Sequence, residues 1–342
     1  MRSNPWFAAP YYLAGKLDMQ GLQRRLSWPS VQFFDRWVVS NMTACDMFHC
    51  FSSFGLLSHR AARARFGAMT VVERGSTHIE VQNELLREEH KRWGAPYKDI
   101  DKRVMDKELA EYEECDYITI QSTFAERSFL QKGVCREKLI CLPLGMDTRI
   151  FSPLPKRDKV FRVCYAGSVS LRKGVLYLLQ AIASLDLPNF EFVINGLIND
   201  EVKDLVKPYW HKVNYVGVRP FHELNALYSQ GSVFVLPTIE DGFAIIITEM
   251  MACGVPVITT RHCGAEDVMT DGVEGFFVPI RDPAAIREKI LYLYENPGIR
   301  ESMSHAALRR ARAMNELDTY GERASGSYET AFRAFKEKRV NR

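Results

Sequence analysis

Short apolar runs alternate with helical patterns throughout the second half of this 342-residue sequence. Continuous apolar runs of this length are typical of strands buried on both faces, and the helices between them then cover the two faces of one parallel sheet. We therefore expect a doubly wound α/β domain in this half. Its strands are expected at 160–166, 190–195, 213–217, 233–237 and 255–259, and its helices at 174–184, 199–211, 221–229 and 242–253, with helix from about 282 to the end.

The first half alternates less regularly, and a chain of this length is long enough for about two domains. A proline-containing segment, 147–159, is the natural linker. We expect domains at 1–150 and 151–315, then a helical segment, 316–342, that packs back on the first domain. In the first domain we expect strands at 45–51, 68–73 and 116–120, an apolar run at 138–144, and helices at 55–66, 79–93, 101–114 and 122–132. Two such domains hold a ligand in the cleft between them, at the carboxyl ends of the strands.

Composition excludes several classes of protein. The net charge of +3 is too small to favour nucleic acid as a partner. None of the eight cysteines lies in a C-x-x-C pair, and several lie in apolar runs, as reduced cysteines of cytoplasmic proteins do. No apolar stretch approaches the roughly 18 to 20 residues that span a bilayer, and no signal peptide is visible. We expect a cytoplasmic protein, at most peripheral at the inner face of a membrane.

A group of arginines is a candidate contact to anionic lipid. An ordinary solvated surface is the simpler explanation of their charge. The group consists of Arg60, Arg63 and Arg65, with Arg24 and Arg25 beside Trp28.

The segment 237–258 carries an acidic pair, Glu240 and Asp241, then Gly242 and a hydrophobic run that contains the single carboxylate Glu249. A carboxylate in so apolar a setting is costly unless something pairs with it. Asp241 and Glu249 are eight positions apart, which is about 12 Å along a helix axis. That reach suits a long ligand with hydroxyls at both ends and a phosphate group in the middle.

The segment 166–174, A-G-S-V-S-L-R-K-G, follows an expected strand and precedes an expected helix. Its small residues let the backbone approach a ligand, Arg172 and Lys173 supply positive charge, and the helix N-terminus adds free N–H groups. These features favour a phosphate-binding loop, although an ordinary strand-to-helix turn with solvated basic residues has the same composition. The segment is neither a Walker A loop nor a G-x-G-x-x-G dinucleotide fingerprint.

Three segments in order resemble the hallmarks of the family-4 retaining glycosyltransferases of the GT-B fold, the glycosyl transferases group 1. Those hallmarks are P-x-G-(V/M)-D-x-x-x-F, a G-(R)-x-x-x-x-K-G phosphate loop, and E-x7-E running into E-A-M-A-C-G-x-P-V-I. Here they are P-L-G-M-D-T-R-I-F at 143–151, the loop 167–174, and 241–258. The resemblance is dense from about residue 112 onward and sparse before it. It implies an α/β protein of two Rossmann-like parallel-sheet domains facing across a cleft.

The resemblance also implies roles in binding a nucleotide-diphospho-sugar. Lys173 would contact the diphosphate and stabilise the charge that builds as the glycosidic bond breaks. Glu249 would hydrogen-bond the ribose hydroxyls, and Asp241 would bind hydroxyls of the transferred sugar; a local or buried partner is the alternative explanation for Glu249. The other donor-binding candidates are Gly167, Ser168, Gly242, Phe243, Ala244 and Ile245.

Two positions depart from the family pattern. Ser168 stands where the family often has arginine, and Arg172 is the candidate to supply the missing positive charge. Asp241 is one methylene shorter than the glutamate of the family. Either Glu240 beside it compensates, or the donor sugar sits differently.

In the first domain, V-V-E-R-G-S-T-H at 71–78 ends an expected strand with polar residues. His78 is similar to the histidine that the family places in the cleft beside donor sugar and acceptor, which makes it a catalytic candidate; a structural role is the alternative. Glu73 and Arg74 are weaker candidates. Retaining transfer on this fold demands no protein general base, because the leaving phosphate helps to deprotonate the acceptor.

We expect no cofactor and no metal ion. Asp99-Ile100-Asp101 fits the D-x-D metal pattern of the other large glycosyltransferase fold. It lies, however, in a run of alternating charge that is typical of a solvated helix face.

The resemblance therefore implies a metal-independent hexosyltransferase of cell-envelope polysaccharide biosynthesis. It would move a sugar from a UDP- or GDP-linked donor to a hydroxyl of a glycan or lipid-linked saccharide. One alternative is a catalytically impaired donor-binding or scaffolding protein of the same fold. Another is a GT-B phosphorylase or epimerase, although we find no motif for the pyridoxal phosphate lysine of glycogen-type phosphorylases.

The opening residues, M-R-S-N-P-W-F-A-A-P, lack the apolar strand and glycine-rich loop with which GT-B enzymes usually begin. Either the start lies upstream of this sequence or the first domain is a shortened variant. A shortened domain would expose a sheet edge and an incomplete core.

Overall fold

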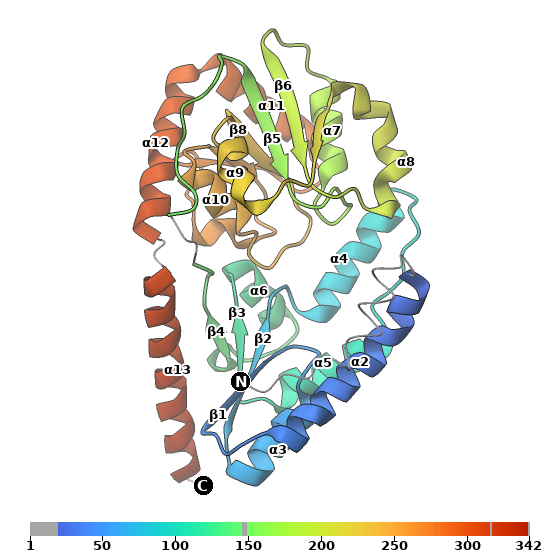
Figure 1. The fold of residues 1–342 in the computed structure, drawn as a ribbon, viewed down its shortest axis with the longest axis vertical. Coiled ribbons are helices and arrows are strands. Elements are labelled where there is room, and N and C mark those ends of the chain that lie inside the picture. Colours follow the sequence, from blue (N-terminus) through green and yellow to red (C-terminus); the bar gives the residue numbers. More distant parts are fainter. Residues whose placement is uncertain (1–19, 146–148, 315–316, 341–342) are drawn as a thin grey trace.

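The structure is a computed structural model that describes residues 20–145, 149–314 and 317–340. Within these ranges the chain forms two parallel sheets, one from each half, and Figure 1 shows the first sheet in the lower part of the molecule and the second in the upper part. The expected pair of parallel-sheet α/β domains is therefore confirmed. The opening residues, and Met146 and Asp147 of the P-L-G-M-D segment, lie outside the described ranges.

The first sheet has the order β1-β2-β3-β4, and every neighbouring pair is parallel. Parallel neighbours need crossover connections, and helices supply them here. The expected elements of this half agree with the observed ones to within a few residues, but the first helix, α2, had no counterpart in the prediction. The elements are α2 (Gln20–Asn41), β1 (Met47–Phe51), α3 (Leu56–Phe66), β2 (Met69–Arg74), α4 (Ile79–Arg92), α5 (Lys102–Glu114), β3 (Tyr117–Ile120), α6 (Thr123–Gln131), the 3₁₀ turn η2 (Arg136–Lys138) and β4 (Leu139–Cys141).

The second sheet has the order β10-β9-β8-β5-β6-β7. The winding of the chain reverses between β5 and β8, and open α/β sheets bind ligands at such a switch point. The elements are β5 (Phe161–Ala166), α7 (Val175–Ala183), β6 (Phe190–Asn195), η3 (Asp200–Val202), α8 (Lys203–Val206), η4 (Lys207–Lys212), β7 (Asn214–Gly217), α9 (Phe221–Tyr228), β8 (Val233–Leu236), α10 (Ile246–Ala252), β9 (Val257–Thr259), η5 (Gly264–Asp267) and β10 (Gly275–Phe277).

Two expected helices differ from the structure. The helix expected at 199–211 is a chain of short pieces, η3, α8 and η4. Pro208 explains why α8 ends at Val206 and η4 follows, because proline has no backbone N–H to continue the α-helical hydrogen bonds. The helix expected from 242 begins only at Ile246, because Ala244 has a left-handed φ of 55° that no α-helix accommodates.

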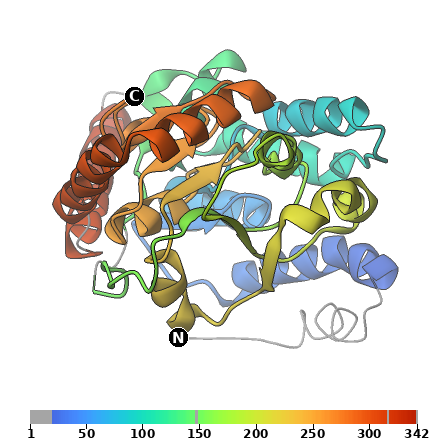
Figure 2. The same cartoon turned by 90° about the horizontal axis from the view of Figure 1, so that it is seen from above.

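After residue 282 the described chain is helical except at Asn296, in α11 (Pro283–Glu295), α12 (Pro297–Met314) and α13 (Leu317–Val340). α12 contacts α10 and α11, whereas α13 runs down beside the lower sheet, opposite α2 (Figure 1 and Figure 2). Tyr328 and Phe332 of α13 pack on a cluster that includes Met69 of β2 and Tyr117 of β3. The last helix of the chain thus lies against the first sheet.

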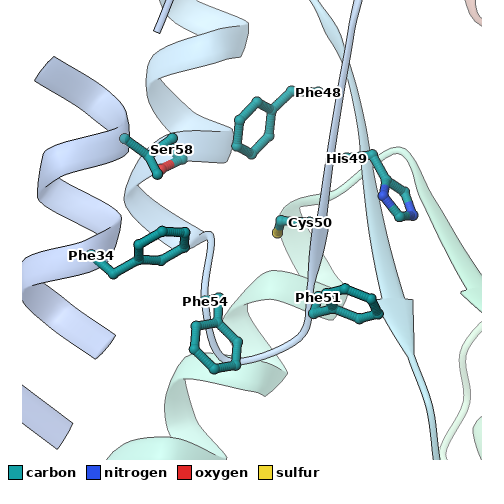
Figure 3. A pocket seen from close by; sticks show the side chains of 8 residues that line it. Phe34, Phe48, His49, Cys50, Phe51, Phe54 and Ser58 are labelled. Atoms are coloured by element: carbon teal, nitrogen blue, oxygen red, sulfur yellow. The ribbon is translucent and has the colours of Figure 1, made fainter. Parts of the chain in front are cut away.

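Among the described strands, β1 is an edge strand of the lower sheet. An apolar cavity of about 500 Å³ lies beside it, between α2 and the β1–α3 loop, and Figure 3 shows the rings that face it. Phe34 of α2 meets Phe54 of the loop edge to face, and Phe51 is 60% exposed. The described part of the first domain therefore has apolar side chains exposed at this edge. The cavity is lined by Phe34, Val38, Phe48, His49, Cys50, Phe51, Phe54 and Ser58.

Candidate functional site

The phosphate-loop segment follows β5 at the switch point. Gly167 and Gly174 have φ of 129° and 65°, which glycine adopts readily. A Cβ on Gly174 would lie 1.9 Å from the carbonyl oxygen of Pro237, just after β8. The loop therefore packs so tightly on the end of the neighbouring strand that only glycine fits at its last position.

The loop after β8 brings the first predicted acid to this place. The ammonium group of Lys173 forms an ion pair with the carboxylate of Asp241, and both side chains are mostly buried. The amide N–H of Lys173 also donates to the hydroxyl of Ser170, at 3.3 Å. The structure thus joins two of the predicted site residues, from different loops, at the carboxyl ends of β5 and β8.

The acid loop, residues 240–245, leads from β8 into α10. Phe243 is buried, and a Cβ on Gly264 would lie 2.5 Å from its ring. Ala244 keeps a left-handed φ, a conformation that costs alanine about 1 kcal/mol or more. The packing around the loop, rather than local preference, therefore fixes its path.

Glu249 lies on α10 and is sparsely solvated. Burial raises the pKa of its carboxyl to about 7. Within the described ranges no hydrogen bond or ion pair reaches this carboxylate, so the alternative of a local partner finds no support there. An unpaired carboxylate in such a setting can accept hydrogen bonds from ligand hydroxyls.

Glu240, which precedes Asp241, is fully buried and heavily partnered. Its Oε1 accepts from the Ser76 hydroxyl at 2.6 Å and from the Thr77 hydroxyl and amide at 2.9 and 3.2 Å. Its Oε2 accepts from Arg172 Nε at 2.8 Å and from Gln82 Nε2 at 3.1 Å. Burial would raise the pKa of this carboxyl, but the guanidinium and these hydrogen bonds outweigh it and lower the pKa to about 2.

This contact corrects our expectations for two residues. Glu240 cannot extend the reach of the shorter Asp241, because its own oxygens are already occupied. Arg172, expected beside the phosphates, instead bonds Glu240 and also donates to the Ser76 hydroxyl at 3.2 Å. The sequence carried a signal for this pairing only in the acidic doublet, and nothing in it marked Ser76 or Thr77 as the partners.

His78 is placed differently from the prediction. The strand before it ends at Arg74, and His78 caps α4 by accepting the amide N–H of Glu80 at 3.3 Å. Its ring is 3% exposed and packs against Tyr112 and Phe129. Burial, with nearby Lys132 and Arg74, lowers its pKa to about 4. The expected position facing the cleft is therefore wrong, because the ring belongs to the aromatic core of the first domain.

A second buried carboxylate of the first domain accepts hydrogen bonds from residues of the second domain. Glu89 of α4 is fully buried and accepts from Trp93 Nε1, from the Tyr177 hydroxyl of α7, and from Arg281 Nε at 2.7 Å. Figure 1 shows α4 between the two sheets. Together with Glu240, this residue joins the two domains by polar contacts.

The D-x-D residues both have partners in the chain. Asp99 accepts from Arg87 Nε at 2.8 Å, and Asp101 caps α5 and pairs with Arg103. In the part of the chain that the structure describes, no cluster of three or more His, Cys, Asp or Glu side chains is arranged to hold a metal ion.

Three of the arginines considered for lipid contact also have partners, whereas the side chains of Arg24 and Arg25 lie outside the described part of the structure. Arg60 pairs with Glu114 and Arg63 with Asp116, while Arg65 donates to the carbonyl of Val39. No helix among the described residues combines the length and the apolar character needed to cross a bilayer.

Comparison with known families identifies the region that carries these loops. Residues 146–310 match the model of the family described as Glycosyl transferases group 1. This region is similar to the group 1 glycosyltransferase domains. It contains the phosphate loop, the acid loop and α10, and so all the predicted donor-binding residues.

Relatives of the group 1 domain carry glycosyltransferase names. The chain is 30% identical to the uncharacterized glycosyltransferase MJ1178 of Methanocaldococcus jannaschii, over 41% of this chain and 40% of that protein. It is 25% identical to MJ1607 of the same organism, over 70% and 66%. It is 29% identical to the capsular polysaccharide biosynthesis glycosyltransferase CapM of Staphylococcus aureus, over 50% and 46%. The chain thus spans between two fifths and two thirds of the length of these relatives.

Solved structures extend the likeness beyond the group 1 domain. Sucrose-phosphate synthase from Thermosynechococcus elongatus superimposes with a TM-score of 0.71 at 21% identity, covering 90% of this chain and 78% of that one. Anabaena HepE in complex with UDP gives 0.69 at 16% identity, covering 88% and 82%. At these identities the likeness concerns the fold, and the fold is GT-B.

Proposed function

We propose that this protein is a retaining glycosyltransferase that moves a hexose from a nucleotide-diphospho-sugar to a hydroxyl acceptor. The observation that carries the proposal is the ion pair between Lys173 and Asp241, which joins the phosphate loop to the acid loop at the switch point of the sheet. A cation for the diphosphate and an anion for sugar hydroxyls are thus held side by side. The family match of the same region supports this assignment.

In the proposed reaction the bond between the anomeric carbon and the diphosphate breaks, and a bond from that carbon to the acceptor oxygen forms on the same face. The acceptor proton passes to an oxygen of the leaving diphosphate. Lys173 would stabilise the negative charge on that oxygen, an interaction that strengthens as the bond breaks. Glu249, whose carboxylate has no hydrogen-bond partner among the described residues, would accept hydrogen bonds from the ribose.

The proposed donor is UDP- or GDP-linked, and the proposed acceptor is a glycan or lipid-linked saccharide of the cell envelope. A solved structure of Anabaena HepE contains UDP-glucose. The name of a Campylobacter jejuni relative, 24% identical, describes transfer to a sugar on diphospho-undecaprenol. Transfer without a metal ion, on the cytoplasmic side and with peripheral membrane contact, belongs to the same proposal.

The test is a screen of UDP- and GDP-sugars by thermal shift, followed by release of nucleoside diphosphate with and without EDTA. A ligand that binds the folded state raises the melting temperature. We expect one donor class to raise it, and turnover to survive EDTA. Lys173→Ala should lower turnover about 100-fold or more and donor affinity much less. If no donor binds, or if Lys173→Ala turns over normally, the assignment is wrong.

A catalytically impaired donor-binding protein is the second candidate. It is favoured by the contact of the acid loop with the first domain, where a Cβ on Gly242 would lie 2.2 Å from the carbonyl oxygen of Gly75. The two domains are thus in backbone contact beside Lys173 and Asp241. Donor binding without transfer or hydrolysis, for every acceptor tried, would favour this candidate.

A further inference from the structure

We infer that Glu240 is a positioning residue that joins the first-domain loop 75–82 to both donor-binding loops, so that domain closure and alignment of the donor groups are one event. The inference rests on the proposed function and assigns Glu240 a part in it. Glu240 is not proposed to touch the substrate, and it acts through the residues on either side of it.

The carboxylate of Glu240 connects three separate segments of the chain. Ser76, Thr77 and Gln82 come from the end of β2 and the first turn of α4, and Arg172 comes from the phosphate loop. Glu240 itself belongs to the acid loop. Because all five donated hydrogen bonds end on one fully buried carboxylate, none of the three segments can shift without breaking some of them.

Hydrogen bonds also join the two donor-binding loops to each other beside Glu240. The amide N–H of Ile239 donates to the carbonyl oxygen of Arg172 at 2.9 Å, and Arg172 Nε also contacts the Glu240 carbonyl at 3.1 Å. The next residue on each loop is Lys173 or Asp241, which form the ion pair. A movement of the Glu240–Arg172 pair is therefore passed on to the paired donor groups through a single peptide unit on each side.

The first domain reaches the acid loop by backbone contact as well. Gly242 lies against the carbonyl of Gly75, and its own carbonyl oxygen accepts the Ser122 hydroxyl. If the domains part, Glu240 keeps Arg172 but loses its partners on loop 75–82. A buried carboxylate that loses hydrogen bonds must be solvated again, so the polar contacts favour the closed arrangement.

Glu89 provides a matched control. It is also a fully buried carboxylate with partners across the domain boundary, Tyr177 and Arg281. Neither partner belongs to the phosphate loop or the acid loop. Loss of its charge should weaken the boundary as loss of Glu240 does, but without disturbing Lys173 and Asp241.

The experiment compares Glu240→Gln with Glu89→Gln in the full chain, using the donor that the screen identifies. For Glu240→Gln we expect kcat to fall about 10- to 100-fold, as for a displaced catalytic group, with donor Kd within about threefold because Lys173, Asp241 and Glu249 remain. Gln82→Leu should lower kcat less than Glu240→Gln does. The double variant should have the kcat of Glu240→Gln, since both substitutions weaken the same contact between the domains. Glu89→Gln should leave kcat and Kd within about threefold of the wild-type values, although its melting temperature should fall by about as much as that of Glu240→Gln.

An unchanged kcat in Glu240→Gln would overturn the inference. So would an equal loss of kcat in Glu89→Gln, which would mean that any weakened boundary has this effect. Hydrogen exchange gives a readout that does not depend on activity: the Thr77 amide, which donates to Glu240, should exchange faster in Glu240→Gln and not in Glu89→Gln. If the wild-type protein binds no donor, the proposed function fails. Hydrogen exchange of the Thr77 amide still shows in that case whether Glu240 holds the two domains together.

Discussion

Glu240 and Glu249 stand nine positions apart on one loop–helix segment, the first fully buried and the second half-buried, and the pKa values of their carboxyl groups shift in opposite directions. The pKa of Glu249 is raised to about 7, whereas that of Glu240 is lowered to about 2. Burial acts on both in the same direction, so the difference lies in their partners. Glu240 accepts from Arg172 and from three residues of the first domain, while no described group bonds the carboxylate of Glu249.

The comparison shows how to tell a structural carboxylate from one that awaits a ligand. A buried carboxylate whose oxygens are all bonded stabilises the fold and has nothing left to offer a substrate. A buried carboxylate without partners is a cost in the free protein, and a ligand that supplies hydroxyl donors removes that cost. On this criterion Glu249 is the better donor-binding candidate of the two.

The largest expected effect is on donor affinity. Glu249→Ala should weaken binding of the nucleotide-sugar by about 100-fold or more, because a charged acceptor of hydrogen bonds is lost (about 1.5–3 kcal/mol for each bond). Stability of the free protein should not fall, since the carboxylate removed is half-buried and has no partner among the described residues. Isothermal titration calorimetry and urea unfolding measure the two quantities. Unchanged affinity would remove Glu249 from the site.

At Glu240 the expected effect of an alanine substitution is on protein stability. Glu240→Ala should lower the free energy of unfolding by about 2 kcal/mol, because Arg172 and the hydroxyls of Ser76 and Thr77 lose their common acceptor. The Arg172 side chain is 36% exposed, so water takes over part of its solvation, and we expect less than for a fully buried pair. Urea unfolding of the two alanine variants side by side is the measurement. Equal free energies of unfolding for Glu240→Ala and Glu249→Ala would mean that the partners of Glu240 do not stabilise the fold.

The raised pKa of Glu249 predicts a pH dependence of donor affinity. Below about pH 7 the free protein holds a proton on this carboxyl, and that proton must leave before the ionised group accepts ribose hydroxyls. Affinity should therefore fall by up to tenfold for each pH unit below about 7 and level off above it. In the free protein, ionisation of the same carboxyl lowers the free energy of unfolding. This loss develops as pH rises from about 4.5, its pKa in the unfolded chain, to about 7, its pKa in the folded protein. Calorimetry with the intact nucleotide-sugar measures the affinity, and Glu249→Gln should abolish the dependence.

Much of the fold was predictable, because strand and helix periodicity depends on local sequence. The strand at 190–195 matches β6 at both ends, and the switch-point loops follow from β5 and β8. The site was predictable only in part. Lys173, Asp241 and Glu249 come from motifs, but the first-domain partners of Glu240 lie more than 150 residues away in the sequence, and sequence periodicity carries no such information. The placement of His78 failed for the same reason: its ring packs on Tyr112 and Phe129, which tertiary structure alone brings together.

The smallest expected effect concerns Ala244, which lies between the two glutamates with a left-handed φ of 55°. Ala244→Gly should raise the free energy of unfolding by about 0.5 kcal/mol, because relief of the backbone strain outweighs the greater freedom of glycine in the unfolded chain. Ala64, exposed within α3, is the matched control, and Ala64→Gly should lower stability by about 1 kcal/mol. Urea unfolding gives both signs. A loss of stability in Ala244→Gly would mean that the acid loop is not strained, and that its path between Glu240 and Glu249 is the one the backbone itself prefers.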